Sequence, residues 1–519
     1  MLPRALLLCV WAVCVGALVG AVRPGDFKGC QDSSVCRRFR HMAEHVDKVA
    51  DAGYESPYAL RPEVQKPHIE GNIVTLPVRS ALYPNVSFEM RISLFADGNA
   101  RVQMDEVSAT YGGWKHYDQA SMWAVKQLPP PAKSPIPFVL ADEGGKGPSR
   151  IFWGNEDAGT RRELILEHEP LKLHFVRDGV VQMILNERGL LHMEHYRAKS
   201  APREEAKDEY GTVDTEKQAA LTFQDRKKEL RLAHRGAGLR RRSPATKLVD
   251  QWAGLEREDG GAWEESWNGI PDNKPKGPEG VALDVSFPGY GTLYGLPEHA
   301  SPLSLRSTRA PPRGEEEEEG RYSDPYRLMN TDVFEYNYDS PMSLYGSAPI
   351  LHAQSRGSSV AVLWMNAAET WIDLHKTRRR PGPRLPHTGV GAPTSTSQED
   401  KSAWSGGSSK LSSHAHFFSE SGVLDMFVFL GPTATRNMER YTSLVGRTAL
   451  PQYFALAYHQ CRWNYFSDTD VKDVTTRFDK ADIPMDVMWL DIEYAKDHMY
   501  GVWDLSLIHI SEPTRPRLI

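Results

Sequence analysis

The chain has 519 residues, of which 40% are hydrophobic and 25% charged, and its formal net charge is −6. This length leaves room for two or three domains with sizeable cores. The composition is typical of a globular protein, and its mildly acidic balance with only local basic clusters excludes the continuous basic face of a nucleic-acid-binding protein. The 13 Trp and 20 Tyr residues suit either sugar-stacking surfaces or a large β-sandwich core.

The first 21 residues have the features of a secretory signal peptide. Arg4 precedes an apolar stretch over residues 5–22, and small residues lead to an expected cleavage site after Ala21. An uncleaved membrane anchor is the alternative, because the stretch approaches the length that spans a bilayer. No later segment is long and apolar enough to span one, so we expect no membrane association after cleavage.

Removal of the signal peptide leaves three cysteines. In the N-terminal segment, residues 22–68, Cys30 and Cys36 can close a small loop as a disulfide in an oxidising compartment. Cys461 has no activating histidine pattern, and we expect a packed or pocket-edge thiol rather than a nucleophile. Asn85, in an Asn-Val-Ser sequon, is a candidate glycosylation site.

Two stretches, residues 69–197 and 281–450, alternate apolar and polar residues between frequent turn residues. This period of two predicts an antiparallel β-sandwich. Between them, residues 198–280 are dense in charge and poor in apolar residues, which favours a solvated insertion. Residues 310–320 and 376–413 are expected to be loops inside the second stretch.

The pattern changes at Pro451. An apolar run over residues 453–458 predicts a buried strand, Ser467 or Asp468 can cap a following helix, and residues 487–490 predict a second strand. Strand, helix and strand make a βαβ unit of the expected size. Asp491 and Glu493 close the second strand, at the end of a parallel sheet where α/β enzymes carry out their chemistry.

Six motifs in a fixed order then suggest a family. They are Tyr-Gly-Leu-Pro-Glu-His-Ala at residues 294–300, Asn-Thr-Asp-Val-Phe at 330–334, Met-Ser-Leu-Tyr-Gly-Ser-Ala-Pro at 342–349, Trp-Met-Asn-Ala-Ala-Glu-Thr-Trp at 364–371, His-Gln-Cys-Arg-Trp-Asn-Tyr at 459–465 and Trp-Leu-Asp-Ile-Glu at 489–493. In this order they resemble glycoside hydrolase family 31, and the likeness extends to about residue 504. It implies a mainly β fold, with an N-terminal antiparallel, galactose-mutarotase-like sandwich followed over residues 451–504 by the first βαβ unit of an incomplete (β/α)8 barrel.

The resemblance also implies a function. Family members of this type are retaining exo-α-glucosidases that trim glucose from N-linked glycans in the lumen of the endoplasmic reticulum, without metal or other cofactor and with a separate β subunit as partner. By the same resemblance, Asp332 would contact sugar hydroxyls and Asp491 would hydrogen-bond the glucose, since a carboxylate forms strong charge-assisted bonds. Trp463 and Trp489 could flank the apolar face of the sugar ring.

One departure from the family decides the expected activity. A retaining glycosidase needs two carboxyl groups about 5–5.5 Å apart across the scissile bond. The family's nucleophile motif, Trp-Asn-Asp-Met-Asn-Glu, does not occur in the chain. Asp491 and Glu493 cannot replace the pair, because two acids on one strand cannot flank a bond from opposite faces.

The end of the chain points the same way. Residues 505–519 form a tail without family likeness, and the 69 residues from Pro451 to Ile519 compare with about 250 for a whole barrel. We therefore predict no catalytic residue and no hydrolysis by this chain alone. The alternative function is a non-catalytic carbohydrate-binding or subunit-docking β-sandwich.

Other polar motifs favour structural roles. Glu298 and His299 are expected to be a buried, hydrogen-bonded pair in a tight loop. His414 and His416 have strand spacing, and no third metal ligand is evident near them.

Overall fold

The computed structural model describes residues 27–51, 60–63, 67–80, 83, 85–109, 112–133, 138–140, 147–154, 161–197, 262–310, 320–333, 336–378 and 411–495. The expected signal peptide, residues 1–21, and most of the charged insertion lie outside these residues. The chain divides into two compact units between Gly446 and Arg447, four residues before the expected start of the second domain. Each unit is described by itself.

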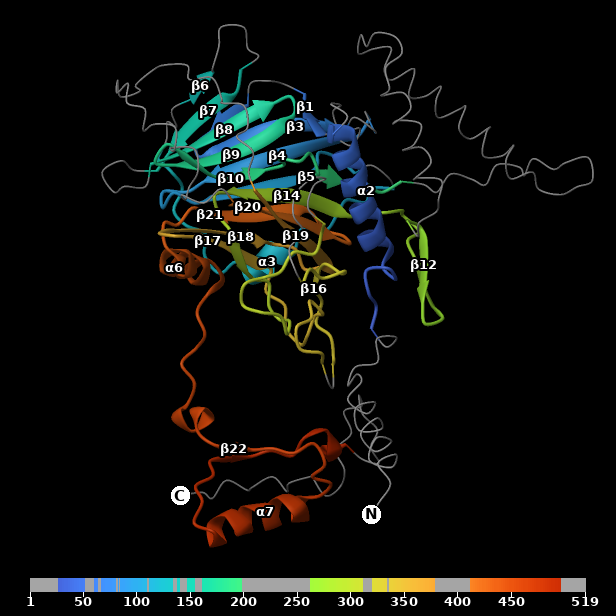
Figure 1. Cartoon of the computed structure of the whole chain (residues 1–519), viewed down its shortest axis with the longest axis vertical. Helices are drawn as coiled ribbons and strands as arrows, with labels where there is room; N and C mark the ends of the chain where they lie inside the picture. The colour runs from blue at the N-terminus through green and yellow to red at the C-terminus, as the bar shows by residue number, and fades with distance from the viewer. Residues whose placement is uncertain are drawn as a thin grey trace, which may run out of the picture. The chain divides into compact units, whose positions relative to one another are not determined.

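Strands dominate the first unit (Figure 1). Within the described residues they form an antiparallel sheet of nine strands and another of ten. The nine-stranded sheet contains, in spatial order, β1 (Leu60–Pro62), β3 (Ile73–Ser80), β4 (Ser87–Leu94), β5 (Ala100–Glu106), β21 (Leu424–Phe429), β18 (Ser358–Trp364), β17 (Ile350–Ser355) and β15 (Thr292–Gly295), with β2 (His68–Glu70) paired to β3. The ten-stranded sheet contains β16 (Tyr326–Leu328), β19 (Thr370–Arg378), β20 (Leu411–Ser419), β14 (Val281–Pro288), β10 (Val180–Leu185), β9 (Leu171–Arg177), β8 (Arg162–His168), β7 (Ser149–Trp153) and β6 (Phe138–Leu140), with β11 (His192–Met193) paired to β14.

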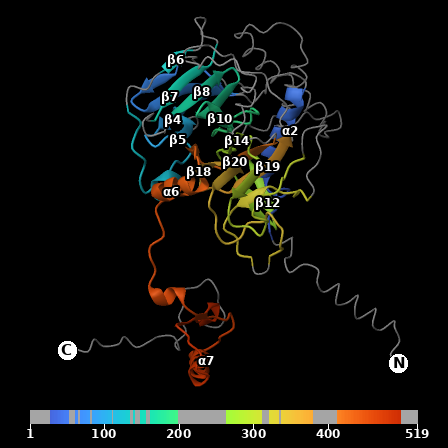
Figure 2. The ribbon, with the colours of Figure 1, turned by 60° about the vertical axis from the view of Figure 1, so that its left-hand side comes forward.

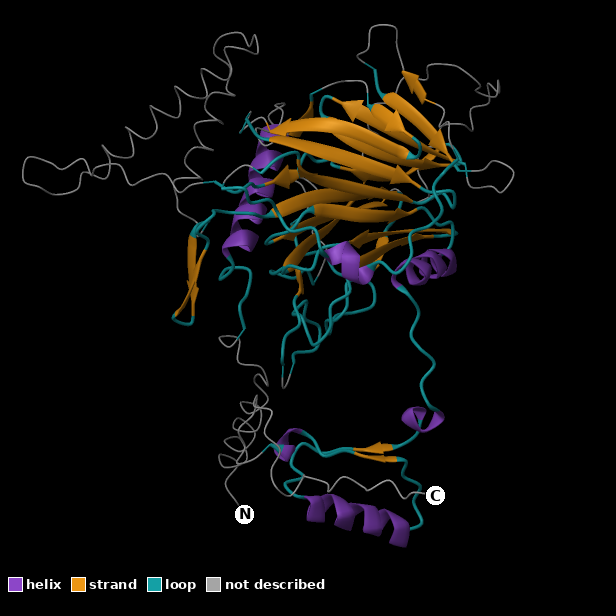
Figure 3. Ribbon diagram, turned by 180° about the vertical axis from the view of Figure 1, so that it is seen from behind, coloured by secondary structure: helices purple, strands orange, loops and turns teal. Residues whose placement is uncertain are grey.

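The inward faces of the two sheets share one hydrophobic core (Figure 3). In β3 the alternation is regular, with Val74, Leu76 and Val78 fully buried and their neighbours partly exposed. Because successive strand side chains point to opposite faces, this alternation places Val74, Leu76 and Val78 together in the core. The predicted sandwich is confirmed.

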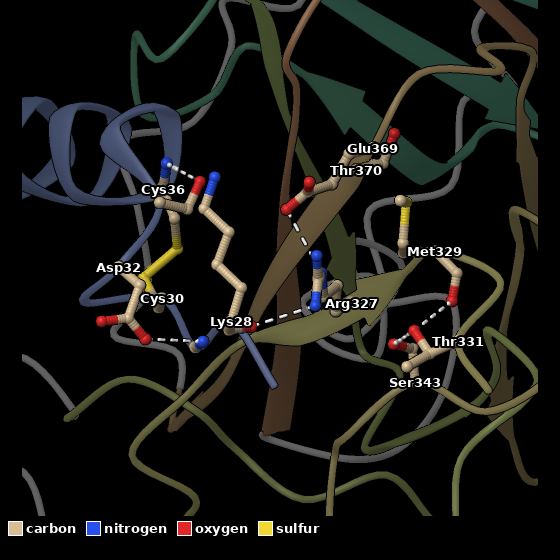
Figure 4. A network of polar contacts seen from close by, with 12 residues as sticks. Lys28, Cys30, Asp32, Cys36, Arg327, Met329, Thr331, Ser343, Glu369 and Thr370 are labelled. Atoms are coloured by element: carbon tan, nitrogen blue, oxygen red, sulfur yellow. Dashed lines mark hydrogen bonds and ion pairs between the residues drawn. A yellow bond between two sulfur atoms is a disulfide. The ribbon is translucent and has the colours of Figure 1, made fainter. Parts of the chain in front are cut away.

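Helix α2 (Ser34–Asp51) covers the outer face of the ten-stranded sheet, and the sequence analysis did not predict it. Phe39 stacks on Phe418 of β20, with 5.7 Å between ring centroids. The expected disulfide is present and ties Cys36, in the first turn of the helix, to Cys30 ahead of it, with 5.3 Å between their Cα atoms (Figure 4). With both faces covered, all eight residues of β14 are buried.

Two further helices lie at one end of the sandwich. Helix α6 (Ala434–Val445) packs beside β18 (Figure 2), and Leu444 contributes to a second apolar cluster there. Thr433 caps α6 by accepting a hydrogen bond from the backbone N–H of Arg436. The short helix α3 (Ala120–Ala124) follows β5 along the chain, and the backbone N–H of Lys126 donates to the carbonyl of Leu444.

The structure corrects two loop assignments. The expected solvated insertion, residues 198–280, ends earlier, because residues 264–273 form the hairpin of β12 (Glu264–Trp267) and β13 (Ile270–Asn273). The expected loop over residues 376–413 is shorter, since β19 runs to Arg378 and β20 starts at Leu411. Of the loop over residues 310–320, residues 311–319 lie outside the described residues.

The second unit contains the predicted βαβ arrangement. Strands β22 (His459–Gln460) and β23 (Val487–Met488) are parallel neighbours, joined through helix α7 (Asp468–Lys480), which Ser467 caps as expected. The predicted strand over residues 453–458 is wrong, because Tyr453–Leu456 form a 3-10 helix, η3, with exposed side chains. Hydrogen bonds to neighbouring strands hold a parallel strand in place. Within the described residues β22 pairs with β23 alone, which accounts for the short length of β22.

None of the described helices is both long and apolar enough to cross a bilayer.

Candidate functional site

The carboxyl ends of β22 and β23 bring the predicted residues of the second unit together. Cys461 and Trp463 follow β22, while Trp489 and Asp491 follow β23. The backbone N–H of Trp489 donates to the carbonyl of Gln460 at 3.0 Å, so the two chains stay side by side as they leave the strands. Parallel strands end at one edge of a sheet, which explains why residues 30 positions apart meet here.

Asp491 has two contacts at this edge. One carboxylate oxygen accepts from the backbone N–H of Ile492 at 2.6 Å, and the other accepts from the thiol of Cys461 at 3.4 Å. Burial and the neighbouring carboxylate raise the pKa of the Cys461 thiol. The thiol is therefore protonated at neutral pH, which does not suit a nucleophile.

The two tryptophans present exposed indole rings on the segments that follow β22 and β23. Trp463 is 54% exposed and Trp489 is 48% exposed. The indole Nε1 of Trp489 donates to Nδ1 of His459 at 2.9 Å, which fixes the direction of that ring. Exposed aromatic faces next to a carboxylate suit a sugar, which offers apolar C–H groups and hydroxyl donors together.

Glu493 does not share the position of Asp491. The strand ends at Met488, Asp491 caps the 3-10 helix η4 (Ile492–Tyr494), and Glu493 lies inside that helix with 4% exposure. The expectation that both acids belong to one strand is therefore wrong. The strand ends early, and the cap at Asp491 turns the following residues away from the strand direction.

A hollow of about 420 Å³ lies between α7 and β23, lined by Val471, Lys472, Thr475, Thr476, Met488 and Leu490. None of the predicted site residues lines it. The hollow marks incomplete packing of the helix on its two strands and does not coincide with the candidate site.

Asp332 belongs to the first unit, in the long connection from β16 to β17. The side chain of Asp332 is exposed. Its neighbour Thr331 holds the loop together. The hydroxyl of Thr331 bonds the hydroxyl of Ser343 at 2.9 Å (Figure 4), and the N–H of Thr331 donates to the carbonyl of Leu344 at 2.7 Å. A hydrogen bond to Asp332 raises the pKa of Tyr345, so the two side chains are neighbours. Sequence reasoning missed Tyr345, because only the folding of the loop brings residues 13 positions apart together.

The remaining polar motifs have structural partners. His299 bonds the carbonyl of Gly295 at 3.0 Å and the hydroxyl of Ser301 at 2.8 Å. Glu298 is exposed and binds Gly346 instead, so the expected buried pair is wrong. His414 and His416 lie on β20 as expected, and among the described residues no three His, Cys, Asp or Glu side chains gather as metal ligands.

Comparison with known proteins identifies the family. The model of the glycosyl hydrolase 31 N-terminal galactose mutarotase-like domain matches residues 89–373, more than half of the chain. This chain belongs to glycosyl hydrolase family 31. The model of the family 31 TIM-barrel domain matches residues 448–510, so the fold expected from the six motifs is confirmed.

Relatives within family 31 place the chain more closely. It is 40% identical over 344 residues to glucosidase 2 subunit alpha of Schizosaccharomyces pombe, covering 66% of this chain and 28% of that protein. It is 30% identical over 507 residues to neutral alpha-glucosidase AB of Mus musculus, covering 96% of this chain and 45% of the relative. The chain therefore spans less than half the length of these relatives.

Solved structures agree. The DNJ-bound crystal structure of a glucosidase II alpha subunit matches with a TM-score of 0.68 and 33% identity, over 93% of this chain and 44% of that one. A heterodimeric complex of ER glucosidase II, consisting of the catalytic subunit and the binding domain of the regulatory subunit, matches with a TM-score of 0.68 and 33% identity, over 92% of this chain and 44% of that one. The chain is therefore similar to glucosidase II alpha subunits in both sequence and fold.

Proposed function

We propose that this chain is the sugar-binding part of a retaining exo-α-glucosidase that trims glucose from N-linked glycans. In this proposal Asp491, Trp463 and Trp489 bind the terminal glucose, and Asp332 contributes a further contact to sugar hydroxyls. The observation that carries it is the contact of Asp491, after β23, with Cys461, after β22, on segments that also carry the exposed rings of Trp463 and Trp489. Solved relatives are bound to DNJ and to alpha3-Glc2, which supports an α-glucoside as the ligand.

A polypeptide of these 519 residues does not hydrolyse the ligand in our proposal. The described carboxylates of the second unit other than Asp491 are poorly placed: four lie on α7, Asp482 and Asp486 precede β23, and Glu493 is buried. A retaining mechanism requires a second carboxyl about 5–5.5 Å from the first, on the other side of the bond. Asp491 therefore recognises the sugar, and the reacting pair is supplied by other residues of the barrel.

Calorimetric titration with DNJ tests the binding. The wild-type chain should release heat on binding, Asp491→Asn should lose most of its affinity, and Asp473→Asn should bind as the wild type does. Asp473 is a matched control because it is an exposed acid on α7, paired only with Arg477 in the contacts of that helix. Equal affinity of the Asp491→Asn variant would refute the assignment.

A hydrolysis assay tests the second part. We expect p-nitrophenyl α-glucoside to be cleaved by the purified chain no faster than by buffer alone. Turnover that disappears in Asp491→Asn would show that this carboxylate takes part in the chemistry and would overturn the division between recognition and catalysis.

We propose further that the chain acts in the lumen of the endoplasmic reticulum with the glucosidase II β subunit. The signal-like N-terminus and the heterodimer among the solved relatives support this. Asn85 is exposed in the turn before β4, as glycosylation requires, and we propose that it carries a glycan. Secretory expression should yield a chain that starts at Val22. This chain should lose mass on glycosidase treatment, whereas the Asn85→Gln variant should not. Both should co-purify with the β subunit.

A further inference from the structure

The loop that carries Asp332 is held by a second segment of the chain. Its two arms meet where the N–H of Thr331 donates to the carbonyl of Leu344 at 2.7 Å. The second arm then binds the turn after β15, because the N–H of Leu344 donates to the carbonyl of Glu298 at 3.1 Å. The backbone around Asp332 is thus tied to Glu298 through Leu344.

Glu298 also holds the next residues of this arm through both of its polar groups. Its N–H donates to the carbonyl of Gly346 at 2.9 Å, and its carboxylate accepts from the N–H of Gly346 at 2.7 Å. A Cβ added to Gly346 would lie 2.9 Å from a carboxylate oxygen of Glu298, so a side chain at this position would displace the carboxylate. A charge-assisted bond from a carboxylate to a backbone N–H is of the stronger kind.

Tyr345 lies between these two anchored residues and reaches Asp332. Its hydroxyl donates to the carbonyl of Val333 at 2.9 Å and lies next to the Asp332 carboxylate. The side chain is 57% exposed, so core packing contributes little to its position. Its orientation therefore depends on the backbone at Leu344 and Gly346.

We propose that Glu298 is a positioning residue for Asp332. By binding Gly346 it fixes Tyr345, whose hydroxyl holds the carbonyl of Val333, and this fixes the backbone from which Asp332 extends toward the sugar. This inference rests on the proposed role of Asp332 in sugar binding.

The ionisation of Tyr345 reports on this chain of contacts without any sugar. In the full chain with ring-labelled tyrosine, NMR titration should show the pKa of Tyr345 above its ordinary value of about 10, because the neighbouring Asp332 carboxylate disfavours the phenolate. Asp332→Asn should lower this midpoint. Glu298→Ala should lower the Tyr345 midpoint by more than half of the change that Asp332→Asn causes. Glu298→Gln should keep the wild-type midpoint, since the amide oxygen also accepts from the N–H of Gly346.

The controls separate positioning from a general loss of structure. Glu89→Ala removes an exposed acid on β4 and should leave the titration of Tyr345 unchanged. Should Glu298→Ala fail to fold, Gly346→Ala disturbs the same contact from the other side and should lower the midpoint in the same way. A midpoint that stays at the wild-type value in Glu298→Ala, or in Gly346→Ala when that variant replaces it, would overturn the proposal, as would an unchanged midpoint in Asp332→Asn.

Titration with DNJ distinguishes this inference from the proposed function. If DNJ binds, Glu298→Ala should weaken binding about as much as Asp332→Asn, and Glu298→Gln should restore it. If the wild-type chain binds no DNJ, the proposed function fails, whereas the Tyr345 midpoints still decide whether Glu298 positions Asp332.

Discussion

The ion pair between Arg38 and Glu194 should govern how firmly α2 is held on the ten-stranded sheet. The guanidinium of Arg38 donates to both carboxylate oxygens of Glu194, one of them at 3.2 Å, and the N–H of Gly280 donates to the same carboxylate at 2.8 Å. Burial alone would raise the pKa of Glu194, but the charge and hydrogen bonds of Arg38 outweigh burial and lower the pKa to about 2. The difference from an ordinary 4.5 corresponds to roughly 3 kcal/mol of stability, at about 1.4 kcal/mol per pH unit.

The sign follows from linkage. A carboxyl whose pKa is lowered by folding stabilises the protein fully above its unfolded pKa of about 4.5, and this contribution disappears as the pH falls toward 2. Arg38→Ala leaves a buried carboxylate without its main counter-charge, so the free energy of unfolding at pH 7 should fall by about 3–5 kcal/mol. At pH 4 the deficit should be smaller, because Glu194 without its counter-charge can take up a proton.

Urea unfolding followed by tryptophan fluorescence at pH 7 and pH 4 measures both effects. Arg91→Ala is the control, because Arg91 is exposed on β4 and its ion pair with Glu89 is long, at 4.0 Å. Loss of this exposed pair should lower the free energy of unfolding by less than about 0.5 kcal/mol. A deficit below about 1 kcal/mol for Arg38→Ala, or one that is equal at both pH values, would refute the reasoning.

Two further predictions concern the first unit. The disulfide closes a short loop, and replacing Cys30 and Cys36 by Ser should lower the free energy of unfolding by roughly 2 kcal/mol in urea titrations; no change would show that the loop is equally ordered without the bond. Residues 198–261 should be replaceable by a short Gly–Ser linker, because their flanks, Arg197 and Trp263, are both held by backbone hydrogen bonds to the same short segment. Thermal melting should show a stability change below about 1 kcal/mol, and a loss of cooperative unfolding would contradict this.

The sandwich could be predicted because its strands alternate regularly, but two elements could not be recognised from composition alone. Helix α2 has apolar residues at helical spacing, yet it has no acidic residue in its first turn and follows the disulfide loop closely. The hairpin of β12 and β13 turns at Asn268 and Gly269, a pair that favours such turns, but the surrounding charge suggested an insertion. In both cases packing on the sheet or local turn chemistry overrides the average composition.

The candidate site was predicted in part for a clear physical reason. Asp491 and Cys461 are brought together by the parallel order of two strands, which chain order alone reveals. The separation of Glu493 from Asp491 depends on where a strand stops, and the contact of Tyr345 with Asp332 depends on the path of a loop. Neither depends on a local sequence pattern.

The most direct measurement of the central claim is an NMR titration of the full chain with DNJ, observing the indole N–H resonances of Trp463 and Trp489. Our account predicts that both resonances shift with one binding constant, that Asp491→Asn removes the shifts, and that Asp473→Asn preserves them. Indole resonances that do not move, or that move equally in Asp491→Asn, would contradict a sugar-binding site at the ends of β22 and β23.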